Sequence, residues 1–338
     1  MAGSKSDSKS ENKNDNKSDH KSYVDISYVD NSYNQFNRQL NKEFSTDLER
    51  ILEYLPLNIS NLIQEEQAWK NGEIIEIRLR VNQPLQLISY KKEILPSDRN
   101  RAPYIIRKKD LERAFMILSK NSIYALERQL SEGYITIAGG HRVGFTGQAV
   151  MENGKLKTIR NINSLNYRIT REVKGVGKKV INTLYNRQYD FYYNTMIISP
   201  PLCGKTTLLR DIIRIISDGD KNQRINGKKV AVVDERSEIA GAYNGVAQNK
   251  IGSRTDLLDN CPKAEGIMLL IRAMSPEVIA VDEIGREEDV LAIQEAVNSG
   301  VSIITTVHGR DLKTIIQRPS IRDLVEMNAF ERYIILSN

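Results

Sequence analysis

The sequence of 338 residues predicts an α/β protein, with a mostly parallel sheet in its C-terminal part and a smaller α+β domain before it. From residue 186 onward, apolar strand-like segments alternate with helical segments, which is typical of a parallel sheet with crossover helices. Residues 44–185 instead combine helical spacing with pairs of alternating strands. Residues 1–43 are polar and low in complexity, and predict a disordered tail.

The tail has a regular charge pattern. Lysine recurs at every fourth position from 5 to 21, and the tetrapeptide Ser-Tyr-Val-Asp occurs at 22 and again at 27. Such a tract buries too little surface to offset its loss of conformational entropy. A basic arm that binds a partner is the alternative, but interleaved acids nearly cancel the lysines: Asp7, Glu11, Asp15 and Asp19.

The α+β domain is predicted in four segments. Residues 45–67 have helical spacing after a Ser45 or Thr46 cap, and residues 73–95 form two strands around a turn at 82–84. Residues 108–133 return to helix, and residues 134–169 alternate as strands with a glycine turn at 139–140. This turn predicts a tight hairpin rather than a phosphate site, so we interpret His141 and Arg142 as structural or interfacial.

The C-terminal domain, residues 186–338, is expected to place strands at 195–198, 229–234, 277–282, 301–306 and 332–336. Helices fill the intervals. Because the sequence printed here ends directly after the last of these segments, we expect no further edge strand beyond it.

A phosphate-binding loop follows the first of these strands. Backbone N–H groups at a helix N-terminus bind phosphate, Lys205 can reach the terminal phosphates, and the Thr206 hydroxyl can bind Mg²⁺. Ser199 stands where the usual pattern has its first glycine. The nearby sequence KGVGKK at 174–179 lacks a preceding strand and a following Ser or Thr, and predicts only a basic turn. The predicted nucleotide-binding residues are Ser199, Pro200, Pro201, Leu202, Cys203, Gly204, Lys205, Thr206 and Thr207.

Polar residues follow three further strands. Asp282 and Glu283 end an apolar strand, which predicts that Asp282 supports the metal while Glu283 orients or deprotonates the attacking water. In a parallel sheet these strand ends share one edge, where ligands bind. Thr306 and His308 are predicted to sense nucleotide or position water. The remaining acids at this edge are Asp234, Glu235 and Glu238.

Composition restricts the class of protein. With two cysteines, Cys203 and Cys261, a disulfide scaffold is excluded, and reduced thiols in a cytoplasm are expected. The apolar runs are of strand length and no signal peptide is evident, so we expect no membrane span. A net charge of +6 weakly favours an acidic partner.

The motifs SPPLCGKTTLLRD, DERSEIAG, RAMSPEVIAVDEIGREED and RPSIRDLVEMNAFERYIILS resemble the stage III sporulation protein AA family. That family is in turn similar to the hexameric ATPases of type II and type IV secretion. The resemblance implies ATP and Mg²⁺ as ligands, with Glu235 and Glu238 in an acidic box, Glu283 as the Walker B carboxylate and His308 in a histidine box.

The resemblance also implies a cytoplasmic ATPase of the mother cell in an endospore former. It would act at a membrane complex through membrane-embedded partners, as a homo-oligomeric ring, and energise a channel or export complex facing the forespore. Charge on the transferred phosphoryl group needs a further cation, and Arg236, Arg254 and Arg272 are candidates to act from a neighbouring subunit.

Two alternatives stay open. The basic segment 91–113 and the high isoelectric point motivate a nucleic-acid-dependent ATPase, although we expect nucleic acid to be an unlikely partner. Ser199 motivates the other alternative, an assembly scaffold that binds nucleotide with little turnover.

Overall fold

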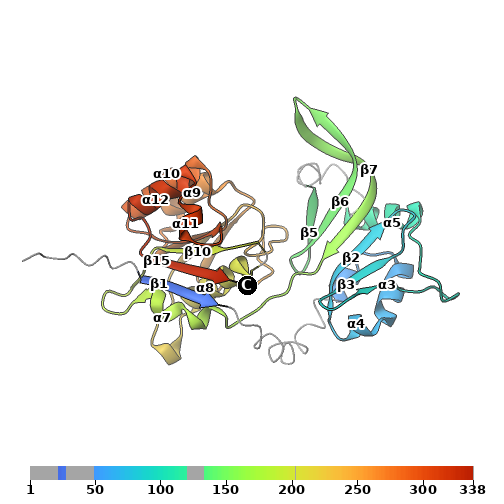
Figure 1. Ribbon diagram of the computed structural model, residues 1–338, viewed down its shortest axis with the longest axis horizontal. Helices are drawn as coiled ribbons and strands as arrows, with labels where there is room; N and C mark the ends of the chain where they lie inside the picture. The colour runs from blue at the N-terminus through green and yellow to red at the C-terminus, as the bar shows by residue number, and fades with distance from the viewer. Residues whose placement is uncertain (1–21, 28–48, 120–132, 202, 338) are drawn as a thin grey trace, which may run out of the picture.

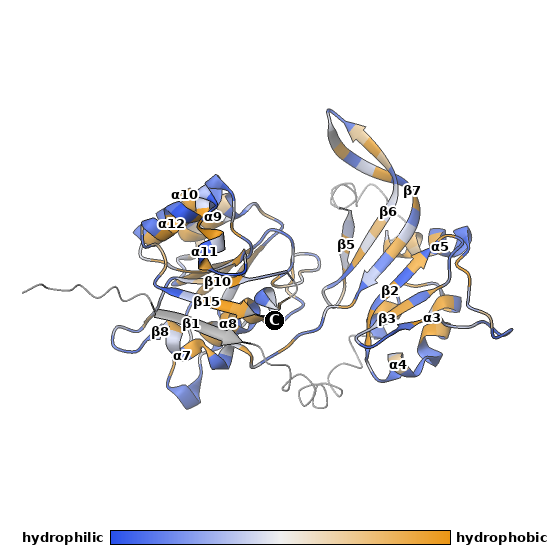
Figure 2. Ribbon diagram, viewed as in Figure 1, coloured by the Kyte–Doolittle hydropathy of each residue, from blue (hydrophilic) through white to orange (hydrophobic). Residues whose placement is uncertain are grey.

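The structure is a computed structural model that describes residues 22–27, 49–119, 133–201 and 203–337. Figure 1 shows two bodies, one formed by the N-terminal α+β region and the other by the C-terminal sheet with its helices. Hydrophobic residues are concentrated on the central strands and on the inner sides of the helices (Figure 2).

The N-terminal body is a six-stranded antiparallel sheet in the order β4-β3-β2-β7-β6-β5. The sequence predicted these strands from alternating apolar residues. Those apolar residues face a single hydrophobic cluster, whose members range from Ile51 to Ile169. Its strands are β2 (Ile74–Arg80), β3 (Gln86–Ser89), β4 (Glu93–Ile94), β5 (Tyr134–Ile137), β6 (His141–Glu152) and β7 (Lys155–Arg168). Its helices are α3 (Leu57–Glu65), α4 (Gln67–Lys70) and α5 (Lys108–Leu118).

Both predicted turns are present, and the segment with helical spacing, residues 45–67, contains helix that is interrupted twice in its described part. Pro56 lacks the N–H that a helix interior requires, so it caps α3 and separates it from a helical turn at 49–52. A second break precedes α4, at Glu66. The expected caps Ser45 and Thr46, and the second half of the predicted helix at 120–132, lie outside the described residues.

The C-terminal body is built on a seven-stranded sheet in the order β1-β15-β10-β14-β13-β11-β12, and every strand pair in it is parallel. Its strands are β1 (Ser22–Ser27), β10 (Thr195–Ser199), β11 (Val230–Asp234), β12 (Thr255–Asp259), β13 (Val278–Val281), β14 (Ser302–His308) and β15 (Arg332–Ser337). The five strands predicted from sequence are confirmed.

Helices cover both faces of this sheet. One face packs against α8 (Lys205–Asp218), while the other packs against α9 (Lys263–Met274), α10 (Glu287–Asn298) and α12 (Pro319–Glu326). Alternate residues of the central strands belong to one cluster or the other, so those strands read as continuous apolar runs. Shorter elements are η2 (Gly177–Lys179), α7 (Ile181–Leu184), β8 (Tyr185–Asn186), β9 (Phe191–Tyr192), η3 (Lys221–Gln223) and α11 (Leu312–Ile315).

Both edges of the sheet differ from the expectation. The edge strand β12 was not predicted, because its sequence TDLLD is polar at both ends and half-buried throughout. At the other edge, β1 pairs with β15 from Ser22 opposite Arg332 to Ser27 opposite Ser337. The predictions of disorder over residues 22–27 and of no strand beyond β15 are therefore wrong.

The hydrophobic clusters also indicate which residues near the domain boundary pack with each body. Val180, Ile181 and Leu184 pack with the C-terminal core, whereas Ile169 packs with the N-terminal one. We therefore propose that the boundary lies between Ile169 and Val180 rather than at 185.

Candidate nucleotide-binding site

The loop between β10 and α8 is shaped to receive an anion. Its left-handed residue is Gly204, with φ of 82°, and α8 begins immediately afterward at Lys205. The first N–H groups of a helix have no intrahelical acceptor, so those of Lys205, Thr206 and Thr207 are available to phosphate oxygens. Of the other predicted loop residues, Pro200, Pro201 and Cys203 lie in the described turn, and Leu202 lies outside the described residues.

Ser199 does not need glycine's conformational freedom. It is the last ladder residue of β10, paired with His308, and its carbonyl accepts a hydrogen bond from Gly309 N–H at 3.0 Å. The left-handed conformation falls on Gly204 instead. The serine is therefore compatible with this loop, because position 199 does not require a positive φ.

Side chains from three elements meet in front of this loop. Lys205 Nζ lies 2.8 Å from Glu283 Oε1 and 3.1 Å from His308 Nε2, and that ring nitrogen also contacts Glu283 Oε1. Lys205 is 8% exposed. Burial tends to raise the pKa of Glu283, but Lys205 and then His308 outweigh it and hold that pKa below its usual range. His308 Nδ1 is buried and lacks a hydrogen-bond partner among the described residues.

A second pair of groups fits a magnesium ion. Thr206 Oγ1 lies 2.8 Å from Asp282 Oδ2, so a hydroxyl and a carboxylate oxygen are adjacent at the helix start. Magnesium prefers such hard oxygen ligands and is usually held by one or two protein groups together with substrate phosphates. Burial raises the pKa of Asp282, although hydrogen bonds from Thr306 and Thr206 oppose this. A cation placed there would favour the ionised carboxylate.

Thr306, two residues before the end of β14, connects the two acids. Its hydroxyl donates to Asp282 Oδ1 and accepts from Glu283 N–H at 2.9 Å, and its carbonyl accepts from Ile284 N–H at 3.1 Å. Glu283 has φ of 53°, which is unusual for a residue other than glycine. Thr306 therefore fixes the turn that carries both carboxylates.

The acidic box forms the adjacent wall. Burial raises the pKa of Asp234 to about 6, while N–H groups that include those of Ala240 and Glu238 oppose the increase. Glu235 contacts Lys263 and lies 3.8 Å from Arg286, whereas Glu238 pairs with Arg142 of the N-terminal sheet at 2.7 Å. A cavity of about 90 Å³ connects these acids with Asp282 and Glu283.

The three candidate arginines are separated by the fold. Arg236 is at the site, with its guanidinium 3.3 Å from Glu283 Oε2. Arg254 precedes β12 and donates to the Ser217 carbonyl at 2.9 Å, at the opposite end of the strands. Arg272 is exposed in the last turn of α9, roughly 14 Å along the helix from Lys263.

Sequence reasoning missed several residues that organise this site. Arg210, buried in α8, donates to the carbonyls of Glu238 and Ile239 and so ties the helix to the acidic box. Lys263 supports Glu235 in the same way. The sequence places Arg210 on the apolar face of an amphipathic helix, and this pattern could have predicted that it is buried. The sequence carries no such signal for Lys263, because its contact with Glu235 depends on tertiary packing.

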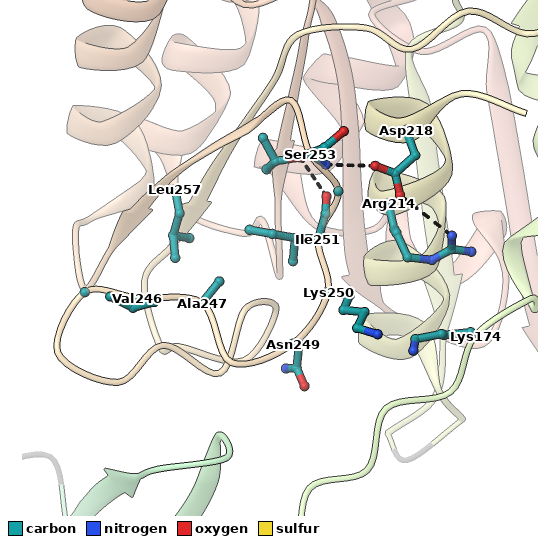
Figure 3. Close-up of a pocket in the computed structure, with 13 residues that line it drawn as sticks. Lys174, Arg214, Asp218, Val246, Ala247, Asn249, Lys250, Ile251, Ser253 and Leu257 are labelled. Carbon is teal, nitrogen blue, oxygen red and sulfur yellow. Dashed lines mark hydrogen bonds and ion pairs between the residues drawn. The ribbon is translucent and has the colours of Figure 1, made fainter. Parts of the chain in front are cut away.

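A larger cavity, of about 740 Å³, lies away from the phosphate loop. Figure 3 shows Lys174, Arg214 and Lys250 on one side of it, and Ile251 and Leu257 on the other. It adjoins the C-terminal end of α8, whereas the phosphate loop is at the N-terminal end, about 20 Å away. This cavity is therefore separate from the nucleotide site.

A parallel sheet with a phosphate loop after β10 and paired acids after β13 defines a P-loop NTPase core. The chain belongs to the family described as sporulation stage III, protein AA, whose model matches residues 45–338. Stage III sporulation protein AA of Bacillus subtilis (strain 168) is 45% identical over 295 residues, which cover 86% of this chain and 91% of that protein. The family resemblance stated from the motifs is confirmed.

Solved structures show the same fold at low identity. The ATPase DotB of Yersinia pseudotuberculosis has a TM-score of 0.55 at 15% identity, covering 84% of this chain and 76% of that one. The pilus retraction motor PilT with bound ADP has a TM-score of 0.50 at 15% identity, covering 77% and 67%. Within the described part of the chain, every helix is too short or too polar to cross a membrane.

Proposed function

We propose that this protein is a magnesium-dependent ATPase that works as an oligomeric motor in endospore formation. The observation that carries this proposal is the meeting of Lys205, Glu283 and His308 beside the Thr206–Asp282 pair. These groups match the needs of phosphoryl transfer: a cation for the phosphates, oxygen ligands for the metal, and a carboxylate to orient water.

The residues have distinct roles in this mechanism. Lys205 and the first N–H groups of α8 bind the terminal phosphates, and Thr206 with Asp282 would hold magnesium, which would supply charge neutralisation at the phosphates. Lys205 is also the cation that lowers the pKa of Glu283. When Lys205 turns to the phosphates, Glu283 loses this partner and becomes more basic, as a base for water requires.

The wider role follows from the family. We propose a cytoplasmic enzyme of the mother cell that forms a ring, with a hexamer as the working hypothesis. It would act through membrane-embedded partners to energise a channel or export complex facing the forespore. Membership of the sporulation family and the fold shared with DotB and PilT support this proposal. Arg236, which is 62% exposed at its side chain beside Glu283, is the leading candidate to act on a neighbouring site.

Phosphate release by the purified protein tests the enzymatic part. We expect release with ATP and magnesium, and its loss with EDTA or in Lys205→Ala. Parallel reactions with DNA, RNA or liposomes separate the motor from a nucleic-acid-dependent enzyme. Nucleotide binding without release under all these conditions would favour the scaffold alternative and contradict the ATPase assignment.

Mixing inactive variants tests the ring. Lys205→Ala retains Arg236, and Arg236→Ala retains the phosphate loop, so a mixed interface can combine one intact loop with one intact arginine. We expect the mixture to recover activity that neither parent has. If no mixture recovers turnover and specific activity is independent of concentration, each site is complete within one chain.

A further inference from the structure

Positive charge is concentrated at one edge of the C-terminal sheet. Residues 177–193 and 220–229 contain seven lysines and arginines and two acids, a net charge of +5 out of +6 for the whole chain. These two segments, which we call the basic edge, include η2, α7, the β8–β9 hairpin and η3. They precede β10 and β11, so they lie at the amino ends of the parallel strands, whereas the nucleotide site lies at the carboxyl ends. In Figure 2, β8 lies on the side of the C-terminal body that faces away from the N-terminal body.

Hydrogen bonds join the two segments into one surface. Arg187, in the turn between β8 and β9, donates to the Gln223 carbonyl of η3 at 2.8 Å and to Asn182 Oδ1 of α7 at 2.8 Å. Lys228 pairs with Asp190 of the same turn at 3.0 Å. The exposed cations of the basic edge lie on η2, on this turn, on η3 or beside Lys228: Lys178, Lys179, Arg187, Lys221, Arg224 and Lys229.

The acids of this region are already used within the fold. Asp190 and Glu277 both pair with Lys228, at 3.0 and 3.2 Å. Asp220 accepts hydrogen bonds from two N–H groups at the start of η3. The exposed cations named above, apart from Lys179, form no ion pair with an acid in the described part of the chain. Their charge is therefore available to an anionic partner.

Aromatic side chains are exposed on the same hairpin. Tyr189 shares its turn with Arg187 and is 68% exposed, and Phe191, the first residue of β9, is 38% exposed. The ladder pairs Tyr185 with Tyr192, and both of these side chains are buried. Because side chains alternate along a strand, Phe191 points to the outer face of the hairpin.

The outer face of the hairpin also carries a cation. The ring centroids of Phe191 and Tyr193 lie 5.3 Å apart, and the Arg332 guanidinium lies 3.6 Å from the Tyr193 ring centroid. Arg332 donates to the Thr183 carbonyl of α7, so this face continues onto the helix that Arg187 contacts. Aromatic rings and positive charge are therefore present on the same surface.

The chemistry of these groups favours a lipid surface over a nucleic acid. Arg187 uses its two terminal nitrogens on protein oxygens, so its fork is not available to a phosphate. Most of the other exposed cations are lysines, whose point charges suit a mobile layer of anionic head groups. Unpaired bases bind to aromatic rings along a charged groove, whereas Tyr189 is in a turn. Tyrosine is also enriched where membranes meet water.

We propose that the basic edge binds directly to an anionic phospholipid surface. The exposed cations lie among the lipid phosphates, and the rings of Tyr189 and Phe191 enter the layer between the head groups and the acyl chains. This proposal goes beyond the motor proposed above, which reaches a membrane only through partners, and it does not depend on ATP hydrolysis. Because the nucleotide site is at the opposite edge of the sheet, it stays accessible while the protein is on the membrane.

Charge reversal tests the electrostatic contact. Lys178→Glu with Lys221→Glu reverses two exposed cations, and Lys178→Arg with Lys221→Arg keeps their charge. Binding is measured by cosedimentation with vesicles of phosphatidylglycerol and phosphatidylcholine, at low and high salt, after circular dichroism confirms folding. We expect the wild type and the arginine variant to bind at low salt but not to pure phosphatidylcholine, and the reversed protein to bind about tenfold more weakly or less. Lys91→Glu with Lys92→Glu, the same charge change on the N-terminal body, should bind as the wild type does.

A second variant examines the aromatic contact. Tyr189→Ser should weaken vesicle binding several-fold, whereas Leu291→Ser, at a residue 66% exposed on α10, should not. A wild type that does not bind anionic vesicles, or a reversed protein that binds them equally well, would show that the proposed contact is wrong. Salt-dependent binding to a single-stranded oligonucleotide in place of vesicles would also overturn it. Phosphate release without vesicles should be equal in all these variants, so a failed lipid contact leaves the ATPase proposal intact.

Discussion

Replacing Thr306 with valine should slow ATP hydrolysis without preventing nucleotide binding. Valine keeps the shape of threonine but removes the hydroxyl that donates to Asp282 and accepts from Glu283 N–H. Thr306 is fully buried, so water cannot easily replace these bonds. A hydrogen bond to a charged group is worth about 1.5–3 kcal/mol. If the catalytic geometry loses that amount, kcat should fall about 10- to 100-fold.

The adjacent residue provides a matched control. Thr305 is equally buried, but its hydroxyl makes one weak contact, 3.5 Å from the Thr306 carbonyl oxygen. Thr305→Val should therefore retain most of the activity, and Thr306→Ser, which restores a hydroxyl, should recover much of what Thr306→Val loses. The assay is steady-state phosphate release, combined with a fluorescent-nucleotide titration for the Kd. Equal activity in the two valine variants would refute the positioning role of Thr306.

Three further predictions concern the surrounding structure. The pKa of Asp234 is raised from its ordinary value of 3.8 to about 6 in the folded protein, so the stabilisation by its protonated carboxyl is complete below about pH 4 and is lost as pH rises through 6. In Asp234→Asn, the free energy of unfolding measured with denaturant should lack this pH-dependent change of about 3 kcal/mol. A pH dependence equal to that of the wild type would contradict the burial of a neutral Asp234. Gly204→Ala forces an alanine to φ of 82° and should weaken nucleotide binding about tenfold in the same titration, whereas wild-type affinity would show that the loop tolerates the strain. Arg142→Ala removes the pair with Glu238 that joins the two bodies, so limited proteolysis between residues 169 and 180 should become several-fold faster, and Arg142→Lys should preserve part of the protection.

The sequence predicted those site residues that directly follow a buried strand or begin a helix. Lys205 and Thr206 follow a buried strand and open a helix, and Asp282 and Glu283 end another buried strand, so the parallel topology brings them together at one edge. The histidine after β14 reaches the same edge for the same reason. The structure therefore brings together groups that lie up to 103 residues apart in the chain.

What could not be predicted depends on partners distant in sequence. The strand β12 is too polar to stand out, and it forms because β11 offers an unpaired edge. The strand β1 lies in a polar tract, and it pairs with β15, which is more than 300 residues away in the sequence. The Arg142–Glu238 pair could not be predicted either, because the sequence around each residue does not indicate that the N-terminal sheet contacts the acidic box.

Comparing Glu283→Gln with Lys205→Ala tests the central claim most directly. The amide of glutamine keeps the shape of the glutamate and loses its basicity, so Glu283→Gln should bind ATP as tightly as the wild type, or more tightly, while phosphate release falls at least 100-fold. Lys205→Ala should lose binding itself, because the cation for the phosphates is gone. Binding and single-turnover hydrolysis are measured on the same preparations. Wild-type turnover in Glu283→Gln, or undiminished binding and turnover in Lys205→Ala, would contradict the assignment of this site as the place where ATP is hydrolysed.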